Sequence, residues 1–352
     1  MPDPDEDDLS IEELREREKS LIALGEMFPG TTLHELGEEL RQGGGWPELL
    51  SGTPMVIDTD IGGDPDDAIA LVAAARAVPS LSLVLTNDET GPAIGYGARS
   101  RFARVLLDSL GRHDVQVVAG HSSGDTRYFC VEQLIPDSVP PQPSDVVAAV
   151  RDLLQASSGP IRWVGIGAFS NLAKVLREIP EAGRRLQVTQ MGGGLNYRDP
   201  SRAEHNVRMD VASAHEVFAA RKDGRIRRLN LVTSDVTFTG KIEITRASSF
   251  YTFLRENQET GWPDLLLQHL ELWFGSFYPG TIQHDPLTLS AALQMAFVDL
   301  DPTNIELDEA GRMTADENGV QVWMSISADY EPFNEWLSEV LTSKDFRTDI
   351  RR

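Results

Sequence analysis

Residues 54–71 constrain the fold of this chain more than any other segment. They begin with the apolar run Met55-Val56-Ile57, continue with five aspartates between positions 58 and 67, and end in an alanine-rich apolar run. Two glycines and a proline lie among the acids, which is typical of a tight turn. The pattern predicts a buried strand, an acidic loop and the start of a helix. In an open α/β sheet, ligands bind at such a place, beyond the carboxyl end of a strand.

The five aspartates of this loop would repel one another if all were ionised and partly buried. A divalent cation with oxygen ligands, Ca²⁺ or Mg²⁺, would relieve that repulsion. The alternative is a solvated acidic turn whose aspartates cap the following helix. The number of acids, and the apolar strand that leads into them, favour the metal site.

Composition and charge narrow the classes of function. The chain has 352 residues and a net charge of −23, so we expect no nucleic-acid interface and no binding to a membrane surface, because both need a basic patch. The sequence contains no run of 18 apolar residues, so no membrane span is predicted. Its acidic N-terminus does not resemble a secretory signal. The single cysteine, Cys130, excludes an internal disulfide. A cytoplasmic protein is therefore the expectation.

The chain is predicted to consist of an acidic helical N-terminal extension, residues 1–53, and one main domain, residues 54–352. The extension has 14 acidic and 4 basic residues, which gives it −10 of the total charge. Capping-box patterns at 10–13 and 32–35 predict two helices, the second ending at Gly43. Residues 1–8 are predicted to be disordered.

Within the main domain, strand-like apolar runs alternate with helical patterns, which predicts βαβ units and a mostly parallel sheet of the α/β class. Strands are expected at 81–85, 115–120, 161–166, 186–191, 229–233, 304–307 and 320–326. Helices are expected at 68–78, 98–110, 145–154, 172–179, 211–220, 287–295 and 332–341, with a mainly helical, aromatic-rich stretch at 247–277.

Four motifs follow one another along this domain. They are Asp58-x-Asp60-x-Gly62-x-x-x-Asp66-Asp67-Ala68, Gly167-x-x-Ser170-Asn171-Leu172, Met191-Gly192-Gly193 with Ala203-Glu204-x-Asn206, and His284-Asp285-Pro286-Leu287. In this order and at these distances, they resemble the inosine/uridine-preferring nucleoside hydrolase family over about 54–326. The resemblance implies a Rossmann-like open, mostly parallel sheet with helices on both faces. It also implies Ca²⁺-dependent hydrolysis of the N-glycosidic bond of ribonucleosides, through an oxocarbenium-like transition state, giving ribose and free base.

The resemblance also implies roles for individual residues. Asp60 would be a Ca²⁺ ligand and the general base, and Asp67, Asp285 and the backbone carbonyl of Ile166 would complete the protein ligands. His284 would be the acid for the leaving group, with His205, His121, Tyr96 and Tyr197 as weaker candidates. The expected substrate contacts are Asp66, Asn87, Met191, Glu204, His205 and Asn206.

The chain departs from the family pattern mainly on the side that would face the base. His205 stands where the family usually has phenylalanine, and Arg198 stands where an asparagine is expected. After the second strand, where the family has an asparagine, Asn87 is the first choice, with Asp88 or Glu89 as alternatives. The acidic loop is two residues longer than in the best-known members, so that either Asp64 or Asp66 could be the carboxylate beside the metal.

Three functions therefore stay open. The first is a Ca²⁺-dependent ribonucleoside N-ribohydrolase of nucleoside salvage, acting as a homodimer or homotetramer on a small ribonucleoside. The second is a hydrolase of another N-ribosyl compound, such as nicotinamide riboside, and the third is a non-catalytic ribosyl-binding protein. Retention of the general base disfavours the third. A DxD-type phosphatase is disfavoured because Ile61-Gly62 break its motif and no partner lysine is evident.

Overall fold

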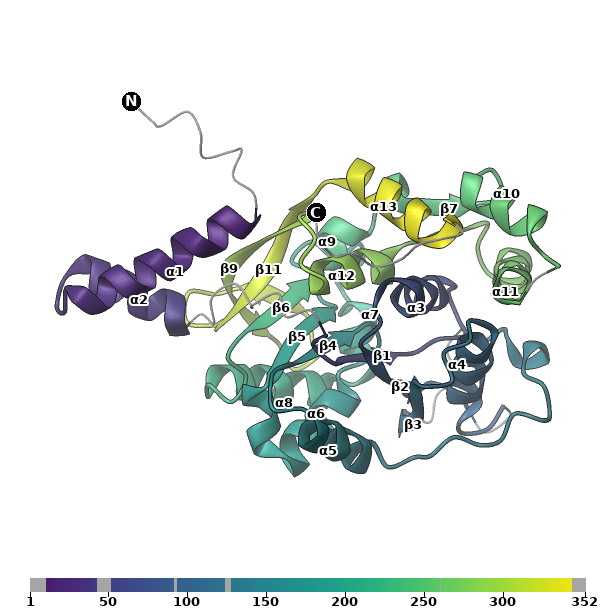
Figure 1. Ribbon diagram of the computed structural model, residues 1–352, viewed down its shortest axis with the longest axis horizontal. Coiled ribbons are helices and arrows are strands. Elements are labelled where there is room, and N and C mark those ends of the chain that lie inside the picture. Colours follow the sequence, from purple (N-terminus) through teal and green to yellow (C-terminus); the bar gives the residue numbers. More distant parts are fainter. Residues whose placement is uncertain (1–10, 43–51, 92–93, 124–127, 260, 344–352) are drawn as a thin grey trace. The chain divides into compact units, whose positions relative to one another are not determined.

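The computed structural model describes residues 11–42, 52–91, 94–123, 128–259 and 261–343, and the chain divides into two compact units, Met1–Leu50 and Ser51–Arg352. The first unit is a hairpin of two helices, α1 (Ile11–Met27) and α2 (Thr32–Gln42) (Figure 1). The helices approach closely at Gly25, where a Cβ atom would lie 2.8 Å from the carbonyl oxygen of Leu33. The disorder predicted for residues 1–8 concerns a segment outside the described residues.

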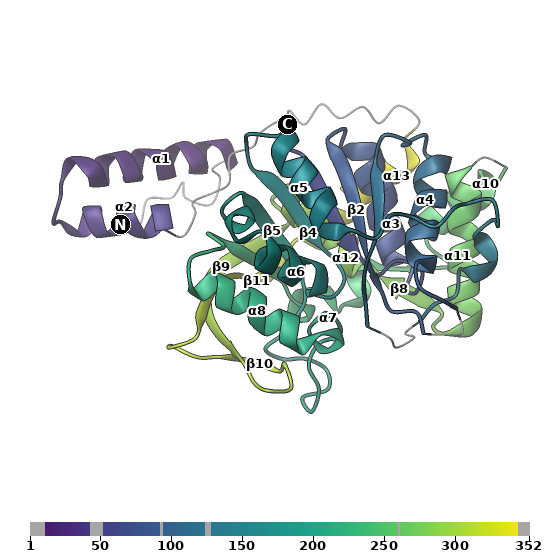
Figure 2. The same cartoon turned by 90° about the horizontal axis from the view of Figure 1, so that it is seen from below.

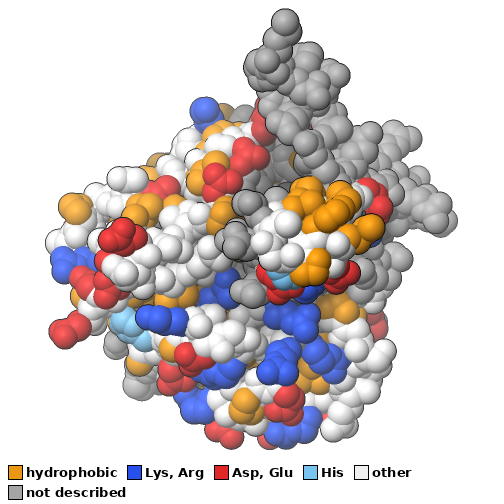
Figure 3. All heavy atoms as spheres, turned by 90° about the vertical axis from the view of Figure 1, so that its left-hand side faces the viewer, with side chains coloured by type: hydrophobic (Ala, Val, Ile, Leu, Met, Phe, Trp, Pro, Cys, Tyr) orange, Lys and Arg blue, Asp and Glu red, His pale blue; other side chains and the backbone are white. Residues whose placement is uncertain are grey.

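Large hydrophobic side chains are exposed at the end of this hairpin. Leu24, Met27 and Phe28 are 41%, 70% and 49% exposed. The face drawn in Figure 3 carries a group of hydrophobic side chains at its surface, next to acidic ones.

The second unit is built on a nine-stranded sheet of the order β10-β9-β11-β6-β5-β4-β1-β2-β3 in the described part of the chain. Its strands are β1 (Met55–Thr59), β2 (Leu81–Asp88), β3 (Gln116–Ser122), β4 (Ile161–Gly165), β5 (Leu186–Met191), β6 (Leu229–Val232), β9 (Val298–Leu307), β10 (Met313–Ala315) and β11 (Val320–Ala328). Among the described strands of this sheet, all pairings from β11 through β3 are parallel, whereas β9 pairs antiparallel with both β11 and β10. The predicted α/β class with a mostly parallel sheet is confirmed.

Helices cover both faces of this sheet (Figures 1 and 2). One layer contains α3 (Asp66–Ala77), α4 (Ala98–Ser109), α10 (Ser249–Glu256), α11 (Trp262–Ser276), α12 (His284–Ala292) and α13 (Tyr330–Thr342). The other contains α5 (Val146–Ala156), α6 (Ser170–Glu178), α7 (His205–Met209) and α8 (Val211–Lys222). The two-stranded sheet of β7 (Glu243–Thr245) and β8 (Gly280–Ile282) adds Ile244 to the core of the first layer, and the short α9 (Ser234–Thr237) follows β6.

Alternation along the strands supplies both cores, because successive side chains of a strand point to opposite faces. In β1, Met55 and Ile57 join the core on the α3 side, whereas Val56 joins the core on the α6 side. A strand buried on both faces reads as a continuous apolar run, which explains the pattern at 55–57.

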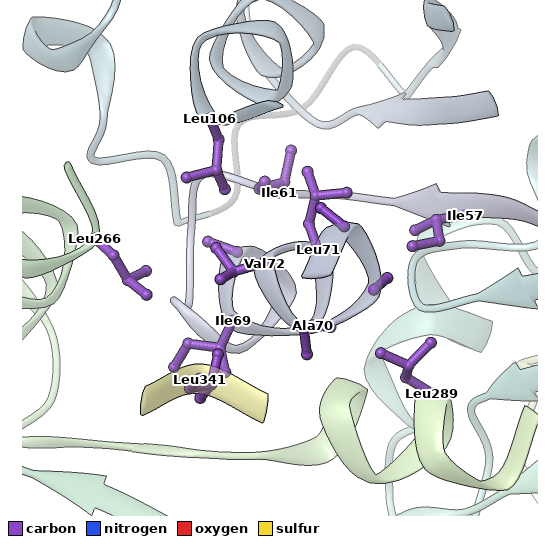
Figure 4. Close-up of a cluster of buried hydrophobic side chains, with 14 of the residues drawn as sticks. Ile57, Ile61, Ile69, Ala70, Leu71, Val72, Leu106, Leu266, Leu289 and Leu341 are labelled. Atoms are coloured by element: carbon purple, nitrogen blue, oxygen red, sulfur yellow. The ribbon is translucent and has the colours of Figure 1, made fainter. Parts of the chain in front are cut away.

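Helix α3 is buried on nearly all sides, which accounts for its alanine-rich sequence. Figure 4 shows Ile69, Leu71 and Val72 projecting from it in different directions, towards Leu341 of α13 and Leu106 of α4, among others. The helix begins at Asp66, two residues before the predicted start, so that Asp66 and Asp67 occupy its first turn. Carboxylates are favourable at that end of a helix.

Two segments illustrate how the structure departs from the sequence prediction. The helical stretch expected at 247–277 is two helices, α10 and α11, with Gly261 at a positive φ (+55°) before the second. The strand expected at 304–307 already starts at Val298. Its first part contains the exposed residues Asp299, Asp301 and Pro302 and therefore lacks the apolar pattern from which a strand is predicted.

The order of the strands reverses at β1, which lies between β4 and β2. In sheets of this kind, the loops that follow the strands on either side of such a reversal diverge and leave a crevice. The acidic loop follows β1, so it lies at this crevice. Among the described residues, no helix is both long and apolar enough to cross a membrane.

Candidate active site

A cavity of about 390 Å³ lies beyond the carboxyl ends of the strands. This volume is in the range of small-molecule sites. All but one of the site residues predicted from the sequence line it: Asp60, Asp66, Asp67, Ile166, Met191, Glu204, His205, Asn206, His284 and Asp285. They come from the ends of β1, β4 and β5, and from the starts of α3, α7 and α12, so the fold brings together residues more than 200 positions apart.

The acidic loop is fixed by groups from other elements. Arg99 of α4 is 1% exposed, and its guanidinium donates hydrogen bonds to the carbonyl oxygens of Asp60 and Ile61. The buried imidazole of His269, on α11, lies with its Nε2 atom 2.9 Å from the carbonyl oxygen of Gly63. A Cβ atom at Gly63 would overlap the carbonyl oxygen of Tyr128, so this close approach requires glycine.

Three carboxylates, Asp66, Asp67 and Asp285, form the acidic floor of the cavity. One oxygen atom from each lies within 4.8 Å of the other two, and all three residues are buried. Burial raises the pKa of each carboxyl group well above its usual value, and repulsion from neighbouring carboxylates adds to the rise. A buried all-oxygen set of this kind fits a hard divalent cation, which would supply the missing positive charge.

Asp60 belongs to a second group, with Glu89 and His205. The Nε2 atom of His205 lies 3.6 Å from Oδ2 of Asp60 and 3.5 Å from Oε2 of Glu89. Burial alone would raise the pKa of Asp60, but the contact with His205 and the charge of Arg99 lower it below its usual value. Burial has the opposite effect on His205 and alone would lower its pKa, but the two carboxylates raise this pKa to about 10.

Glu204 and Asn206 lie where α7 begins. Oε2 of Glu204 caps the helix by accepting hydrogen bonds from the backbone N–H groups of Asn206 and Val207, and it also accepts one from Gly193. The side-chain amide of Asn206 donates to the carbonyl oxygens of Ile166 (3.3 Å) and Met191 (3.2 Å). These contacts fix the orientation of both side chains at the cavity wall.

Asn87 is the predicted site residue that does not line the cavity. Its amide donates to Oδ1 of Asp58 (2.9 Å) and to the carbonyl oxygen of Ala168 (3.1 Å), and Asn171 also donates to Oδ1 of Asp58 (2.8 Å). Asn87 and Asn171 therefore both donate hydrogen bonds to the fully buried carboxyl group of Asp58. Burial raises the pKa of this group to about 8. Glu89, one of the two alternatives, faces the cavity in its place.

His284 lies against aromatic and basic side chains. Its Nδ1 atom is 2.7 Å from the hydroxyl oxygen of Thr237, and its ring stacks on Phe238 with centroids 6.1 Å apart. The guanidinium of Arg198 lies 4.5 Å from the centre of the Phe238 ring. Burial, together with the charges of Arg198 and His205, lowers the pKa of His284 to about 3, so the imidazole is neutral at pH 7.

The other acid candidates divide into two groups. Tyr197 lines the cavity. Tyr96 and His121 are not among the lining residues: the hydroxyl group of Tyr96 donates to the carbonyl oxygens of Ala119 and Gly120, and Nε2 of His121 lies 4.0 Å from Oδ2 of Asp210. Asp64 lines the cavity beside Asp66 and accepts a hydrogen bond from Thr281, so both loop carboxylates reach the site.

Some lining residues were not singled out from the sequence. Arg99 lies three positions before Phe102, on the apolar face of its helix, and a charged residue on such a face is a signal that could have identified it. Tyr128, Phe238 and Tyr278 also line the cavity. Trp273, in the aromatic-rich stretch at 247–277, is 2% exposed, lines the cavity and donates its indole N–H to the carbonyl oxygen of Gly280 (3.0 Å).

Comparison with known proteins gives matches along most of the chain. The family model described as inosine-uridine preferring nucleoside hydrolase matches residues 55–335. The non-specific ribonucleoside hydrolase RihC of Klebsiella pneumoniae subsp. pneumoniae is 25% identical over 322 residues, which cover 82% of this chain and 98% of that protein. The RihC protein of Escherichia coli O7:K1 is 24% identical over 323 residues, with the same coverage.

Solved structures share the fold. A nucleoside hydrolase of Bacillus anthracis superimposes with a TM-score of 0.64 at 17% identity, over 82% of this chain and 99% of that one. The purine-preferring ribonucleoside hydrolase of Gardnerella vaginalis gives 0.65 at 21%, over 82% and 98%. The type III effector XopQ, solved with adenosine diphosphate ribose, gives 0.64 at 17%, over 82% and 94%. At these identities the likeness shows the fold alone.

Proposed function

Because the chain belongs to the inosine-uridine preferring nucleoside hydrolase family and is a nucleoside N-ribohydrolase, we propose that it cleaves the N-glycosidic bond of a ribonucleoside in this cavity, with Ca²⁺ as cofactor. The family that the four motifs predicted is confirmed. One observation carries the proposal: the residues implied by those motifs converge on one cavity, with buried carboxylates at its floor and Glu204 and Asn206 at its wall. We assign catalysis to residues 54–352 and regard 1–53 as an extension.

The donor set supports the choice of a hard cation. Asp60, Asp67, Asp285 and the carbonyl oxygen of Ile166 would hold it, with Asp66 beside them, and only oxygen atoms are offered. When bound, Ca²⁺ would orient the ribose hydroxyls and make the attacking water more acidic. Its positive charge would also offset the cost of burying the carboxylates.

Asp60 has the properties required of the general base. Its lowered pKa keeps the carboxylate ionised at pH 7, so it can accept a proton from water. The surrounding carboxylates would stabilise the positive charge that develops on the ribose as the bond to the base breaks. Backbone contacts hold Glu204 and Asn206 in place. Glu204 would accept hydrogen bonds from the sugar hydroxyls, Asn206 would exchange hydrogen bonds with them, and Met191 would pack against the sugar ring.

His284 would act on the leaving group as a neutral imidazole. Its low pKa means that it can donate one N–H hydrogen bond to the departing base but does not hold an additional proton at pH 7. His284 is therefore not a cationic acid that protonates the departing base, either in the resting enzyme or when the substrate first binds. Stabilisation of the departing base would rest on this hydrogen bond and on the aromatic wall.

A second candidate substrate is another N-ribosyl compound, such as nicotinamide riboside. Arg198, at the position where an asparagine is expected, lies over Phe238, so the leaving-group side presents an aromatic face for a planar ring beside a guanidinium that favours a neutral or anionic leaving group. A structural neighbour, XopQ, was solved with adenosine diphosphate ribose. Both substrates use the same ribose contacts and the same base.

The test is ribose release from a panel of ribonucleosides and nicotinamide riboside, with Ca²⁺ and with a chelator. We expect Asp60→Ala and chelation each to reduce turnover by at least about 10³-fold, because the base or the cation is lost. The matched control, Asp137→Ala, removes an exposed aspartate outside the cavity and should keep full activity.

The outcomes separate the candidates. Release from nicotinamide riboside alone would select the second substrate. Absence of release from every compound, by a folded protein that binds Ca²⁺ and ribose, would contradict hydrolysis and select the ribosyl-binding role. Sedimentation of the same samples would test the homodimer or homotetramer, which we propose together with a cytoplasmic role in nucleoside salvage.

A further inference from the structure

Asp60, Glu89 and His205 form a group of ligating atoms separate from the acidic floor. One atom from each lies within 4.8 Å of the other two, and Asp66, Asp67 and Asp285 form another such group. We propose that Asp60, Glu89 and His205 hold a second divalent cation, of the borderline class that includes Zn²⁺, Co²⁺ and Mn²⁺. This inference concerns metal content and does not depend on which substrate the enzyme hydrolyses.

The carboxylate of Glu89 is the first observation in support. Its side chain is 2% exposed, and neither Oε1 nor Oε2 has a hydrogen-bond partner among the described residues. Buried carboxylates are normally hydrogen-bonded or coordinate a metal, and the contact of the Glu89 carboxylate with a cationic group is the 3.5 Å approach of His205 to Oε2. The residue lines the cavity, so a cation could reach it.

The spacing of the atoms is the second observation. The imidazole Nε2 atom lies 3.6 Å and 3.5 Å from the two carboxylate oxygens, which is longer than a normal hydrogen bond. In a tetrahedral site with bonds of about 2.1 Å, neighbouring ligand atoms are about 3.4 Å apart. The observed distances therefore fit a shared metal better than they fit direct hydrogen bonds.

The chemistry of the donors determines the class of cation. An imidazole nitrogen with two carboxylates suits Zn²⁺, Co²⁺ or Mn²⁺, whereas Ca²⁺ prefers oxygen ligands only. The acidic floor offers only oxygen, so the two groups should select different ions, with Asp60 between them. Three protein ligands leave a position open towards the cavity, as in catalytic metal sites.

The competing explanation is that a charged His205 neutralises the two carboxylates by itself. A single N–H at this distance from both oxygens would leave Oε1 of Glu89 without a partner among the described residues. Arg208 also lies near, with Nη2 3.5 Å from Nδ1 of His205. The two explanations differ in one measurable quantity, the number and kind of ions bound per chain.

The experiment uses the untagged full-length chain, stripped of metal with a chelator and saturated with Ca²⁺. The chain is then equilibrated with micromolar Co²⁺, and both metals are counted by mass spectrometry. We expect one Co²⁺ per chain, with no loss of Ca²⁺ and with a visible absorption band of a nitrogen-ligated ion. His205→Phe and Glu89→Gln should each weaken Co²⁺ binding by roughly 100-fold or more while keeping Ca²⁺.

His121→Phe is the matched control, because it removes a histidine near the same edge of the sheet but outside the group, and it should bind Co²⁺ as the wild type does. The proposal is overturned if the Ca²⁺-loaded wild type takes up no Co²⁺. It is also overturned if the His205→Phe variant takes up as much as the wild type, or if Co²⁺ enters only by displacing Ca²⁺. None of these readouts uses nucleoside turnover, so failure here leaves the proposed hydrolysis to its own test.

Discussion

Glu204 has two tasks that a single residue substitution can separate. Its Oε2 atom caps α7 and holds Gly193, and the residue also lines the cavity. Glu204→Ala should lose about 1 kcal/mol of stability through the missing cap and should raise KM through the missing sugar contact. Glu204→Gln keeps an oxygen acceptor, so its stability should stay closer to that of the wild type while KM still rises. Urea unfolding and steady-state kinetics would measure both effects, and equal stability of the two variants would contradict the capping role.

Gly63 illustrates a steric requirement at the scale of one atom. A Cβ atom there would overlap the carbonyl oxygen of Tyr128, and backbone atoms cannot move aside as a flexible side chain can. We expect Gly63→Ala to reduce the free energy of unfolding by about 1 to 3 kcal/mol. Gly159→Ala is the control, since no atom of the described residues lies within 4 Å of the new methyl group and its φ is not left-handed. Similar melting temperatures for both variants would argue against this packing.

At the level of elements, His269 joins helix α11 to the acidic loop. Its ring is buried edge-on against Phe102, with Nε2 at the carbonyl oxygen of Gly63, and burial lowers its pKa to about 4, aided by the charge of Arg99. Between pH 6.5 and pH 4, the unfolded chain therefore binds more protons at this residue than the folded chain. The stability from this group is complete above pH 6.5 and is lost as the pH falls, by up to about 3 kcal/mol.

A variant that does not titrate isolates this contribution. His269→Gln retains an N–H donor for Gly63 and has no charge at any pH. We expect its free energy of unfolding to decline less than that of the wild type between pH 7 and pH 4.5, by about 2 kcal/mol. Parallel pH profiles from denaturant titrations would show that His269 is not the residue responsible.

The same elements show what the sequence can predict and what it cannot. Apolar runs fix where β1 lies, and spacing along the chain identifies the carboxylates that follow it. The choice between Asn87 and Glu89 depended on where β2 ends. The apolar pattern stops at Leu85, but the strand continues to Asp88, which keeps Asn87 within the sheet beneath Asp58 and makes Glu89 the first residue beyond it. The added pairing of Asp88 with Ser122 comes from β3, which lies about 30 residues away.

At the scale of the whole molecule, the net charge of −23 complicates any test of the metal. Divalent cations at millimolar concentration screen a strongly acidic surface, so a rise in melting temperature alone does not indicate a site. A specific site adds stability that rises with the logarithm of the free cation concentration above Kd, about 2.7 kcal/mol at 100 times Kd. The buried carboxylates Asp66, Asp67 and Asp285 are the groups whose ionisation that binding would offset.

We therefore expect Ca²⁺ to raise the melting temperature of the chelator-treated wild type by about 5 °C. Asp285→Asn retains the shape of the side chain but removes one carboxylate of the acidic floor, so it should lose most of that shift. Because it also relieves repulsion within the floor, it should melt above the wild type when no Ca²⁺ is present. Differential scanning fluorimetry with Ca²⁺, and with K⁺ at matched ionic strength, measures both effects. An equal response of the two proteins to Ca²⁺ would assign the effect to the acidic surface as a whole, because screening acts on total charge while coordination depends on Asp285.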